Sequence, residues 1–260
     1  MKNQTVKVNK FEYIIIGLSA LLLFFIVAPL VSLFMEANPS LSGKMIENQE
    51  VINAIKVSLE ASILSVLLLI VTGVPLAYIL ARHSFPGKQF VEALVDLPLV
   101  MPHAVAGIMI LSAFGSRGLL GSYFSDIGFI IEDNFKGIVI VMAFVSIPLL
   151  VDTVKVGFQL IGSSLESVAR TLGASEWRAF TSITLPLSFK HILAGALLGW
   201  ARGLSEVGAL LVVAYYPKTV NILILEYLSV YGLKYAATLS AIYASIVLLI
   251  FIVLKMVASK

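Results

Sequence analysis

Six long apolar runs, each close to the length needed to cross a lipid bilayer, divide this chain. A helix needs about 20 mainly apolar residues to span the hydrocarbon core of a membrane. The runs do not alternate polar and apolar residues, as the strands of an outer-membrane barrel would. The sequence therefore predicts an all-α integral membrane protein with six transmembrane helices. We expect these helices at residues 13–34, 54–81, 97–114, 137–158, 192–215 and 236–256.

Composition supports a membrane protein over a soluble one. Hydrophobic residues make up 59% of the chain and charged residues only 13%, whereas about a quarter of the residues of a soluble domain are charged. The chain has no cysteine, which excludes disulfides, a thiolate zinc site and cysteine catalysis. The first apolar run follows Lys2, Lys7 and Lys10, but it is too long for a signal peptide, so we interpret it as a retained anchor.

The distribution of basic residues predicts the orientation in the membrane, because loops rich in lysine and arginine stay in the cytoplasm. With the N-terminus inside, eleven basic residues fall on the cytoplasmic face and six on the opposite face. Both termini and the loop between the fourth and fifth helices are then cytoplasmic. The chain contains no linker, so we expect a cytoplasmic segment at 1–12 and a single transmembrane domain over 13–260, in the cell membrane.

The loop before the fifth predicted helix is charged and rich in small residues. Ser163 and Glu166 have the spacing of a capping box, which starts a helix, and Gly173 can stop it. Ser175 can cap a second short helix, and Pro186 ends the unit and is tolerated in the first turn of the next membrane helix. We call this predicted pair of helices, residues 163–186, the knob.

Both helices of the knob are expected to have an apolar side. Such a loop can lie on the lipid headgroups, with Trp177 and Arg178 at the interface, or it can bind a partner outside the membrane. The apolar residues recur at three- and four-residue intervals in the first helix and form one side of the second: Leu165, Val168, Ala169, Leu172, Trp177, Phe180 and Ile183.

The spacing of residues within the knob favours the partner. A-x-x-x-G, followed by nine residues and I-x-L-P, is matched by Ala169, Gly173, Ile183, Leu185 and Pro186. This pattern resembles the EAA loop of binding-protein-dependent ABC importer permeases, whose coupling helix docks on the ATP-binding subunit. The resemblance implies a coupling site at Glu166, Ala169, Arg170, Gly173, Trp177, Ile183, Leu185 and Pro186.

One position departs from that family pattern. The glutamate of the family stands six residues before the glycine, where this chain has Ser167, and Glu166 is displaced by one residue. The contact usually made by that glutamate is therefore the part of the resemblance in doubt.

The sequence contains no recognisable nucleotide-binding, metal-binding or catalytic motif. It contains no G-x-x-x-x-G-K-[ST] phosphate loop, no H-E-x-x-H motif and no nucleophile elbow, and its three histidines lie in separate segments, where we interpret them as loop or helix-end residues. We therefore expect no catalytic residue, metal or cofactor, and no nucleic-acid partner. The resemblance implies a separate ABC ATPase dimer, an extracytoplasmic substrate-binding protein and a second permease copy.

The fifth predicted helix carries two charges inside the membrane, where charged side chains are costly. Arg202 and Glu206 stand four residues apart and can pair. They can lock helices together, or they can belong to a gate beside the translocation path. The same helix has Gly195, Gly199 and Gly203 at every fourth position, a face suited either to a dimer or to a neighbouring helix of the same chain. The candidates for the path or gate are Arg202, Glu206, Pro98, Pro102, Gly199 and Gly203.

Longer segments narrow the class of substrate. PLAYILAR (75–82), FPGK (85–88), DLPLVMPHAVAGI (96–108) and WARGLSEVGA (200–209) resemble permeases for oxyanions, especially the molybdate and tungstate type. Sulfate and thiosulfate permeases have similar segments and remain an alternative. A passive anion channel or secondary transporter would require a proton relay or inverted repeats, and a membrane-embedded enzyme would require more reactive groups than this chain shows.

Overall fold

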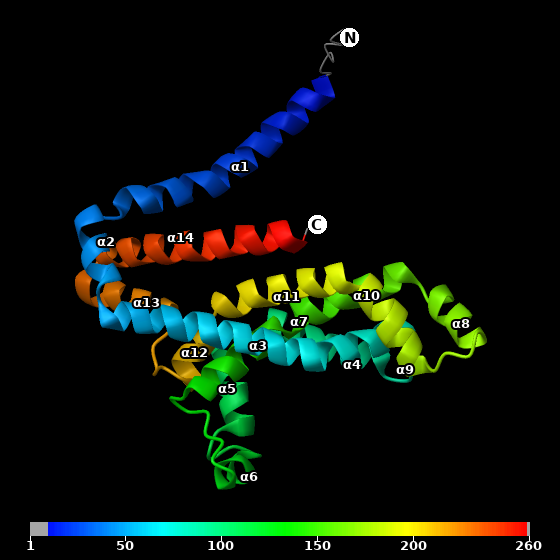
Figure 1. The fold of residues 1–260 in the computed structure, drawn as a ribbon. Helices are drawn as coiled ribbons and strands as arrows, with labels where there is room; N and C mark the ends of the chain where they lie inside the picture. Colours follow the sequence, from blue (N-terminus) through cyan, green and yellow to red (C-terminus); the bar gives the residue numbers. More distant parts are fainter. Residues whose placement is uncertain (1–9, 259–260) are drawn as a thin grey trace.

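The structure, a computed structural model, describes residues 10–258 (Figure 1). Within these residues all regular secondary structure is helical, which confirms the predicted all-α class. Four helices are long and apolar enough to cross a membrane. They are α1 (Lys10–Glu36), α3 (Gln49–Arg82), α7 (Phe135–Ile161) and α14 (Leu233–Ala258).

The sequence predicted one helix for the third apolar run, but the structure has two. α4 (Lys88–Val100) and α5 (His103–Phe114) are separated by Met101 and Pro102. Pro102 has no N–H to donate, and its ring disfavours the helical conformation at the preceding residue. Met101 is accordingly extended, with ψ 136°. Pro102 therefore interrupts this run, whereas Pro98 lies inside α4.

The fifth run is also broken, and here the prediction of one helix over 192–215 was wrong. α11 (Phe189–Leu204) ends before residues 205–207, and the short α12 (Gly208–Val213) follows. The amide of Asn221 donates to the carbonyl oxygens of Leu204 at 2.9 Å and Glu206 at 3.1 Å. This side chain satisfies carbonyl groups that lose their helical partners at the break.

Segments expected to be external loops contain helices of their own. α13 (Val220–Tyr231) occupies a stretch in which no helix was predicted, and the loops also hold α2 (Pro39–Ile46) and α6 (Gly121–Asp126). Asn38 and Asn48 cap α2 and α3 through their side-chain oxygens, so these starts follow ordinary capping chemistry.

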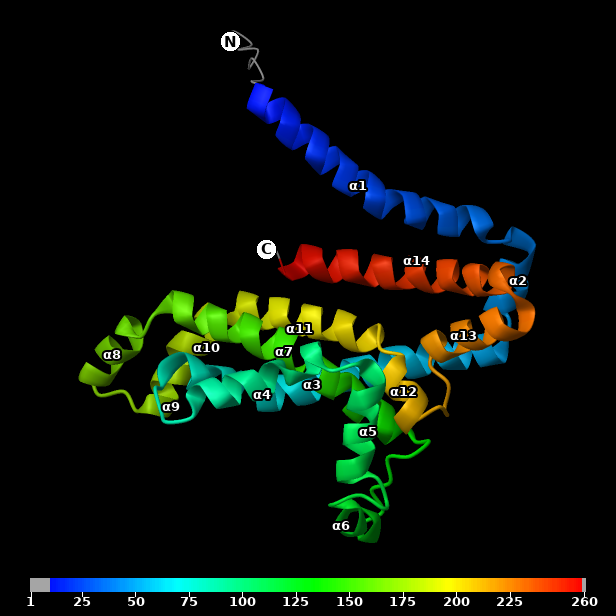
Figure 2. The ribbon, with the colours of Figure 1, turned by 180° about the vertical axis from the view of Figure 1, so that it is seen from behind.

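α7 forms the centre of the bundle and packs mainly against α3 and α11. α2 and α13 lie at one end of the molecule, and α8 (Ser164–Thr171) and α9 (Glu176–Ala179) lie at the other (Figures 1 and 2). α1 diverges from the bundle and its apolar stretch is not buried. A π-helix (Phe180–Thr184) and α10 (Leu185–Leu187) complete the knob.

Candidate functional site

The knob consists of two helices joined at Gly173, as predicted. Gly173 has φ +94°, a left-handed conformation that glycine adopts without steric cost. The N–H of Ala174 donates to the carbonyl of Ala169 at 3.0 Å, which closes the end of α8. Ser175 caps α9 by accepting from the N–H of Arg178.

One predicted detail of the knob was wrong, because Ser163 makes no capping hydrogen bond with its side chain. Pro186 lies in the first turn of α10, and the chain bends by 68° between the segments Glu176–Leu187 and Phe189–Leu204.

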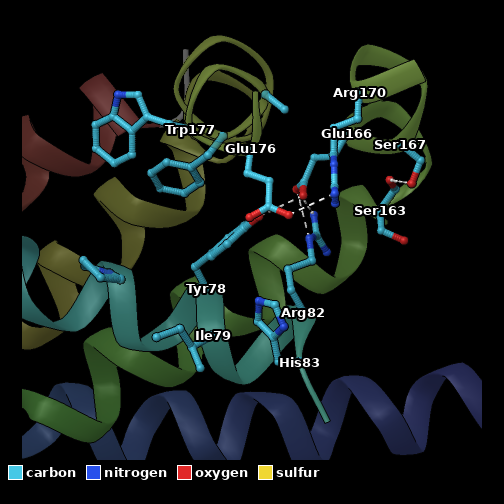
Figure 3. Close-up of a pocket in the computed structure, with 13 residues that line it drawn as sticks. Tyr78, Ile79, Arg82, His83, Ser163, Glu166, Ser167, Arg170, Glu176 and Trp177 are labelled. Atoms are coloured by element: carbon cyan, nitrogen blue, oxygen red, sulfur yellow. Dashed lines mark hydrogen bonds and ion pairs between the residues drawn. The ribbon is translucent and has the colours of Figure 1, made fainter. Parts of the chain in front are cut away.

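An ion pair anchors the knob to the end of α3. Arg82 approaches Oε1 of Glu166 with Nη2 at 2.9 Å and with Nε at 3.0 Å. Tyr78 donates to Oε2 at 2.9 Å, and Thr184 donates to Oε1. Figure 3 shows Tyr78 and Arg82 reaching up from α3 to Glu166 in the first helix of the knob. Glu166 therefore holds the knob in place from within and is not an exposed contact residue.

Arg82 also fastens the end of α7. Its Nη1 donates to the carbonyl of Phe158 at 2.7 Å and its Nη2 to that of Gly162 at 2.6 Å. The side chains of Arg82 and Glu166 are only 8% and 12% exposed, so the planar guanidinium joins α3, α7 and α8 at a nearly buried point.

The environment of Glu166 favours its charged form. Burial would raise the pKa of this carboxyl, but hydrogen bonds from Thr184, Arg82 and Tyr78, together with the charge of Arg82, outweigh burial. The pKa of Glu166 is therefore lowered from its ordinary value, and the anchor is charged at neutral pH.

Beside the anchor lies an open pocket of about 620 Å³. Trp177 and Phe180 line it from the knob, and Pro75, Tyr78 and His83 line it from α3 and the residue that follows. The ring of Phe180, which follows α9, lies 4.7 Å from that of Tyr78, so the second part of the knob contacts α3 beside the pocket.

The knob exposes several large apolar residues. Leu172 is 83% exposed, Trp177 74% and Val168 58%, and no residue of α8 is buried. Soluble surfaces rarely group large apolar side chains in this way without a partner. Ser167, at the position of the family's glutamate, is exposed and donates to the carbonyl of Ser163. Arg170 pairs with Glu176 at 3.0 Å across the two helices.

A second cluster joins the two broken apolar runs. Arg202 donates to Oε2 of Glu206 at 3.0 Å, so the predicted pair is present. His103, the first residue of α5, donates from Nδ1 to the same oxygen at 2.7 Å. The other oxygen of Glu206 accepts from the N–H of Ala209 at 2.9 Å, which stabilises the start of α12.

The glycines of α11 face a helix of the same chain. A Cβ at Gly195 would lie 3.0 Å from the carbonyl oxygen of Leu150, and one at Gly203 would lie 3.0 Å from Oγ of Ser146. Both contacts belong to α7. Of the two predicted uses of this face, the structure shows packing within the chain.

Sequence reasoning missed several residues of both clusters. Tyr78, Arg82 and Thr184 were not assigned to the knob, and His103 was interpreted as a loop or helix-end residue. Arg82 offered a signal, because it is a basic residue at the end of a membrane helix whose preceding turn carries a tyrosine. Pairing of His103 with Glu206 joins residues 103 positions apart, and nothing local in the sequence indicates it. Within residues 10–258, no group of three or more histidine or acidic residues could hold a metal ion.

Comparison with known proteins identifies related chains. The family model described as binding-protein-dependent transport system inner membrane component matches residues 73–259. A molybdate/tungstate transport system permease protein of Thermococcus kodakarensis is 42% identical over 250 residues, covering 95% of this chain and 96% of that protein. Its counterpart in Pyrococcus furiosus is 44% identical, with 95% of each chain covered.

Solved structures share the fold. A bacterial ABC transporter that imports the acidic polysaccharide alginate superposes with a TM-score of 0.74 at 19% identity, covering 96% of each chain. A bacterial alginate transporter in complex with an alginate pentasaccharide-bound periplasmic protein superposes with a TM-score of 0.72 at 19% identity, covering 94% of this chain and 92% of that one.

Proposed function

The chain belongs to the family of binding-protein-dependent transport system inner membrane components, and we propose that it is the membrane permease subunit of an ATP-driven importer for molybdate or tungstate. Two relatives named for molybdate/tungstate transport are at least 42% identical to the chain over nearly its whole length, which supports this class of substrate. The cluster of Arg202, His103 and Glu206 places a guanidinium within an apolar run, and an anion path needs such a positive charge.

We propose six membrane crossings. Four are the long helices, and the other two are the broken pairs α4–α5 and α11–α12. The first pair is interrupted at Pro102, and at the interruption of the second pair Asn221 binds the backbone carbonyl groups that lack helical partners. The excess of basic residues on one face supports an orientation with both termini and the knob in the cytoplasm. ATP hydrolysis then belongs to a separate ABC ATPase dimer, and an extracytoplasmic binding protein delivers the anion to a pair of permease copies.

The observation that carries the coupling proposal is that the knob is both anchored and apolar on its surface. It is fastened to α3 and α7 through Glu166 and Arg82. It also exposes Leu172, Trp177 and Val168. A rigidly held element with an exposed apolar surface can transmit force from a bound subunit, which is what an ATPase must apply to a permease.

The test is uptake by the complete transporter reconstituted in liposomes with ATP inside. Gly173→Pro removes the left-handed turn of the knob, and Ala169→Glu places a bulky charge on α8. Both variants should insert and assemble but lose ATP-driven uptake of tungstate. Tyr123→Phe, at an exposed residue of α6, is the matched control and should transport normally. Normal uptake by both knob variants would contradict the coupling role, and competition among tungstate, molybdate and sulfate tests the substrate class.

A further inference from the structure

The carboxylate of Glu206 binds Arg202 and His103, one from each broken run. These two partners are more exposed than the carboxylate itself. The side chain of Glu206 is 0% exposed, that of Arg202 is 18% exposed and that of His103 is 56% exposed. The carboxylate therefore lies behind, and the cationic and polar nitrogen atoms lie on the open side. A pair that serves packing alone has no need of this asymmetry.

His103 supplies a hydrogen-bond donor. A carboxylate only accepts hydrogen bonds, so Nδ1 of His103 carries the proton that it donates to Glu206. Within residues 10–258, the polar contacts of His103 involve Nδ1, so this N–H is the group that the side chain can offer to an acceptor. Nη2 of Arg202 lies 3.3 Å from Nδ1 of His103, so the guanidinium and the imidazole lie edge to edge on the open side.

The segments on either side of the break between α4 and α5 are apolar. Leu99, Val100 and Ile108 lie in these segments, and all three are exposed. A charge in apolar surroundings is screened less than one in water. An anion that reaches this point meets the guanidinium of Arg202 and the Nδ1–H of His103, both of which already bind the carboxylate of Glu206.

Resting on the proposed function, we propose that Arg202 and His103 form a transient binding site for the transported oxyanion and that Glu206 is its built-in competitor. A tetrahedral oxyanion presents several acceptor oxygen atoms and suits the two N–H groups of a guanidinium. The carboxylate of Glu206 occupies the same donors when the anion is absent. Its competition keeps the affinity low, so that the anion passes onward and is not retained.

Removing the competing charge provides the first test. Glu206→Gln retains an oxygen that can accept from Ala209, but it leaves Arg202 without a counter-ion. In the assembled complex in nanodiscs, without nucleotide or binding protein, bound tungstate is measured by mass spectrometry of tungsten. We expect Glu206→Gln to bind tungstate about tenfold more tightly than the wild type, equivalent to about 1.4 kcal/mol, and to take it up more slowly.

Two further variants identify the source of that affinity. Arg202→Gln or His103→Gln, added to Glu206→Gln, should abolish the tighter binding. Glu60→Gln, which removes a charge from the exposed pair of Lys56 and Glu60, is the control and should bind as the wild type does. Binding by Glu206→Gln no tighter than the wild type, or tight binding that survives loss of Arg202, would overturn the site.

The double variant Arg202→Gln with Glu206→Gln decides the question even if Glu206→Gln alone does not assemble. A pair that only locks the helices can be replaced by neutral groups of similar shape with little effect, so uptake would stay near the wild-type rate and the proposal would fail. An oxyanion site needs the guanidinium, so we expect uptake to fall at least about tenfold. Absence of tungstate uptake by the wild type would count against the proposed substrate instead, which keeps the two failures distinct.

Discussion

Loss of the carboxylate of Glu166 should release the knob from α3 without unfolding the membrane part. Glu166 accepts hydrogen bonds from α3 and from Thr184, and no residue of α8 is buried. The apolar contacts of α8 are therefore weak, and this carboxylate is the main attachment of the helix. Breaking a buried ion pair by removing one partner costs about 3–5 kcal/mol.

We expect Glu166→Ala to lie near the lower end of that range. The guanidinium of Arg82 keeps two carbonyl partners, at Phe158 and Gly162, so it is not left alone. A loss of about 3 kcal/mol corresponds to faster exchange of the α8 amide hydrogens by about 100-fold, since each 1.4 kcal/mol is a factor of ten.

Hydrogen-exchange mass spectrometry of the solubilised protein measures this directly in a peptide over α8. Glu176→Ala is the matched control, because its pair with Arg170 has side chains 58% and 77% exposed. Such surface pairs contribute about 0–1 kcal/mol, so exchange should change less than about fivefold. Unchanged exchange of α8 in Glu166→Ala would refute the anchor.

Three further predictions concern the same elements. Gly173→Ala should destabilise the end of α8 by about 1–2 kcal/mol because of the left-handed backbone, whereas Gly173→Asn should cost less; exchange of the amide of Ala174 compares them. Because the pKa of Glu166 is lowered, its contribution is complete above the ordinary value of 4.5 and is lost as pH falls through the lower folded-state value; α8 exchange, corrected for its intrinsic rate, should therefore match between pH 8 and pH 5 and rise only in stronger acid. Leu172→Asp should abolish co-purification of the ATPase subunit while the melting temperature of the permease stays within about 2 °C, because surface substitutions rarely exceed about 0.5 kcal/mol; retention of the ATPase would contradict docking on this surface.

The sequence predicted the long helices well because their signal is local. A run of about 20 apolar residues has few stable alternatives in a membrane, and α3, α7 and α14 follow their runs closely. The turn at Gly173 was also predicted, because positive φ strongly favours glycine. The interruption at Pro102 follows from the missing N–H of proline.

The break after Leu204 could not be predicted from local pattern, because residues 192–215 contain no proline to interrupt the helix. Its stability depends on Asn221, which satisfies the carbonyl groups from a distant helix, and on Glu206, which accepts from Ala209. The role of Glu166 was mistaken for a similar reason. Its spacing to Ser163 suits a capping box, but Arg82 offers a charged partner, and a charge-assisted hydrogen bond is stronger than a neutral cap.

α11 connects the two clusters mechanically. This 16-residue helix begins just after the bend at Ser188 and extends about 24 Å, ending two residues before Glu206. Its glycine face lies against α7, where Oγ of Ser146 is 2.7 Å from the carbonyl oxygen of Gly199. Close backbone contact of this kind resists rotation of one helix against the other.

Displacement of the knob must therefore be accommodated where the helices are interrupted. Arg82 holds the ends of α3 and α7 together with α8, and α7 holds α11 through its glycine face, so these elements move as a unit. The helices of the third and fifth apolar runs are interrupted at residues 101–102 and 205–207. Both interruptions meet at Glu206, through His103 on one side and Arg202 on the other. We therefore expect a force applied to the knob to reach this cluster, and we propose that the path opens or closes there.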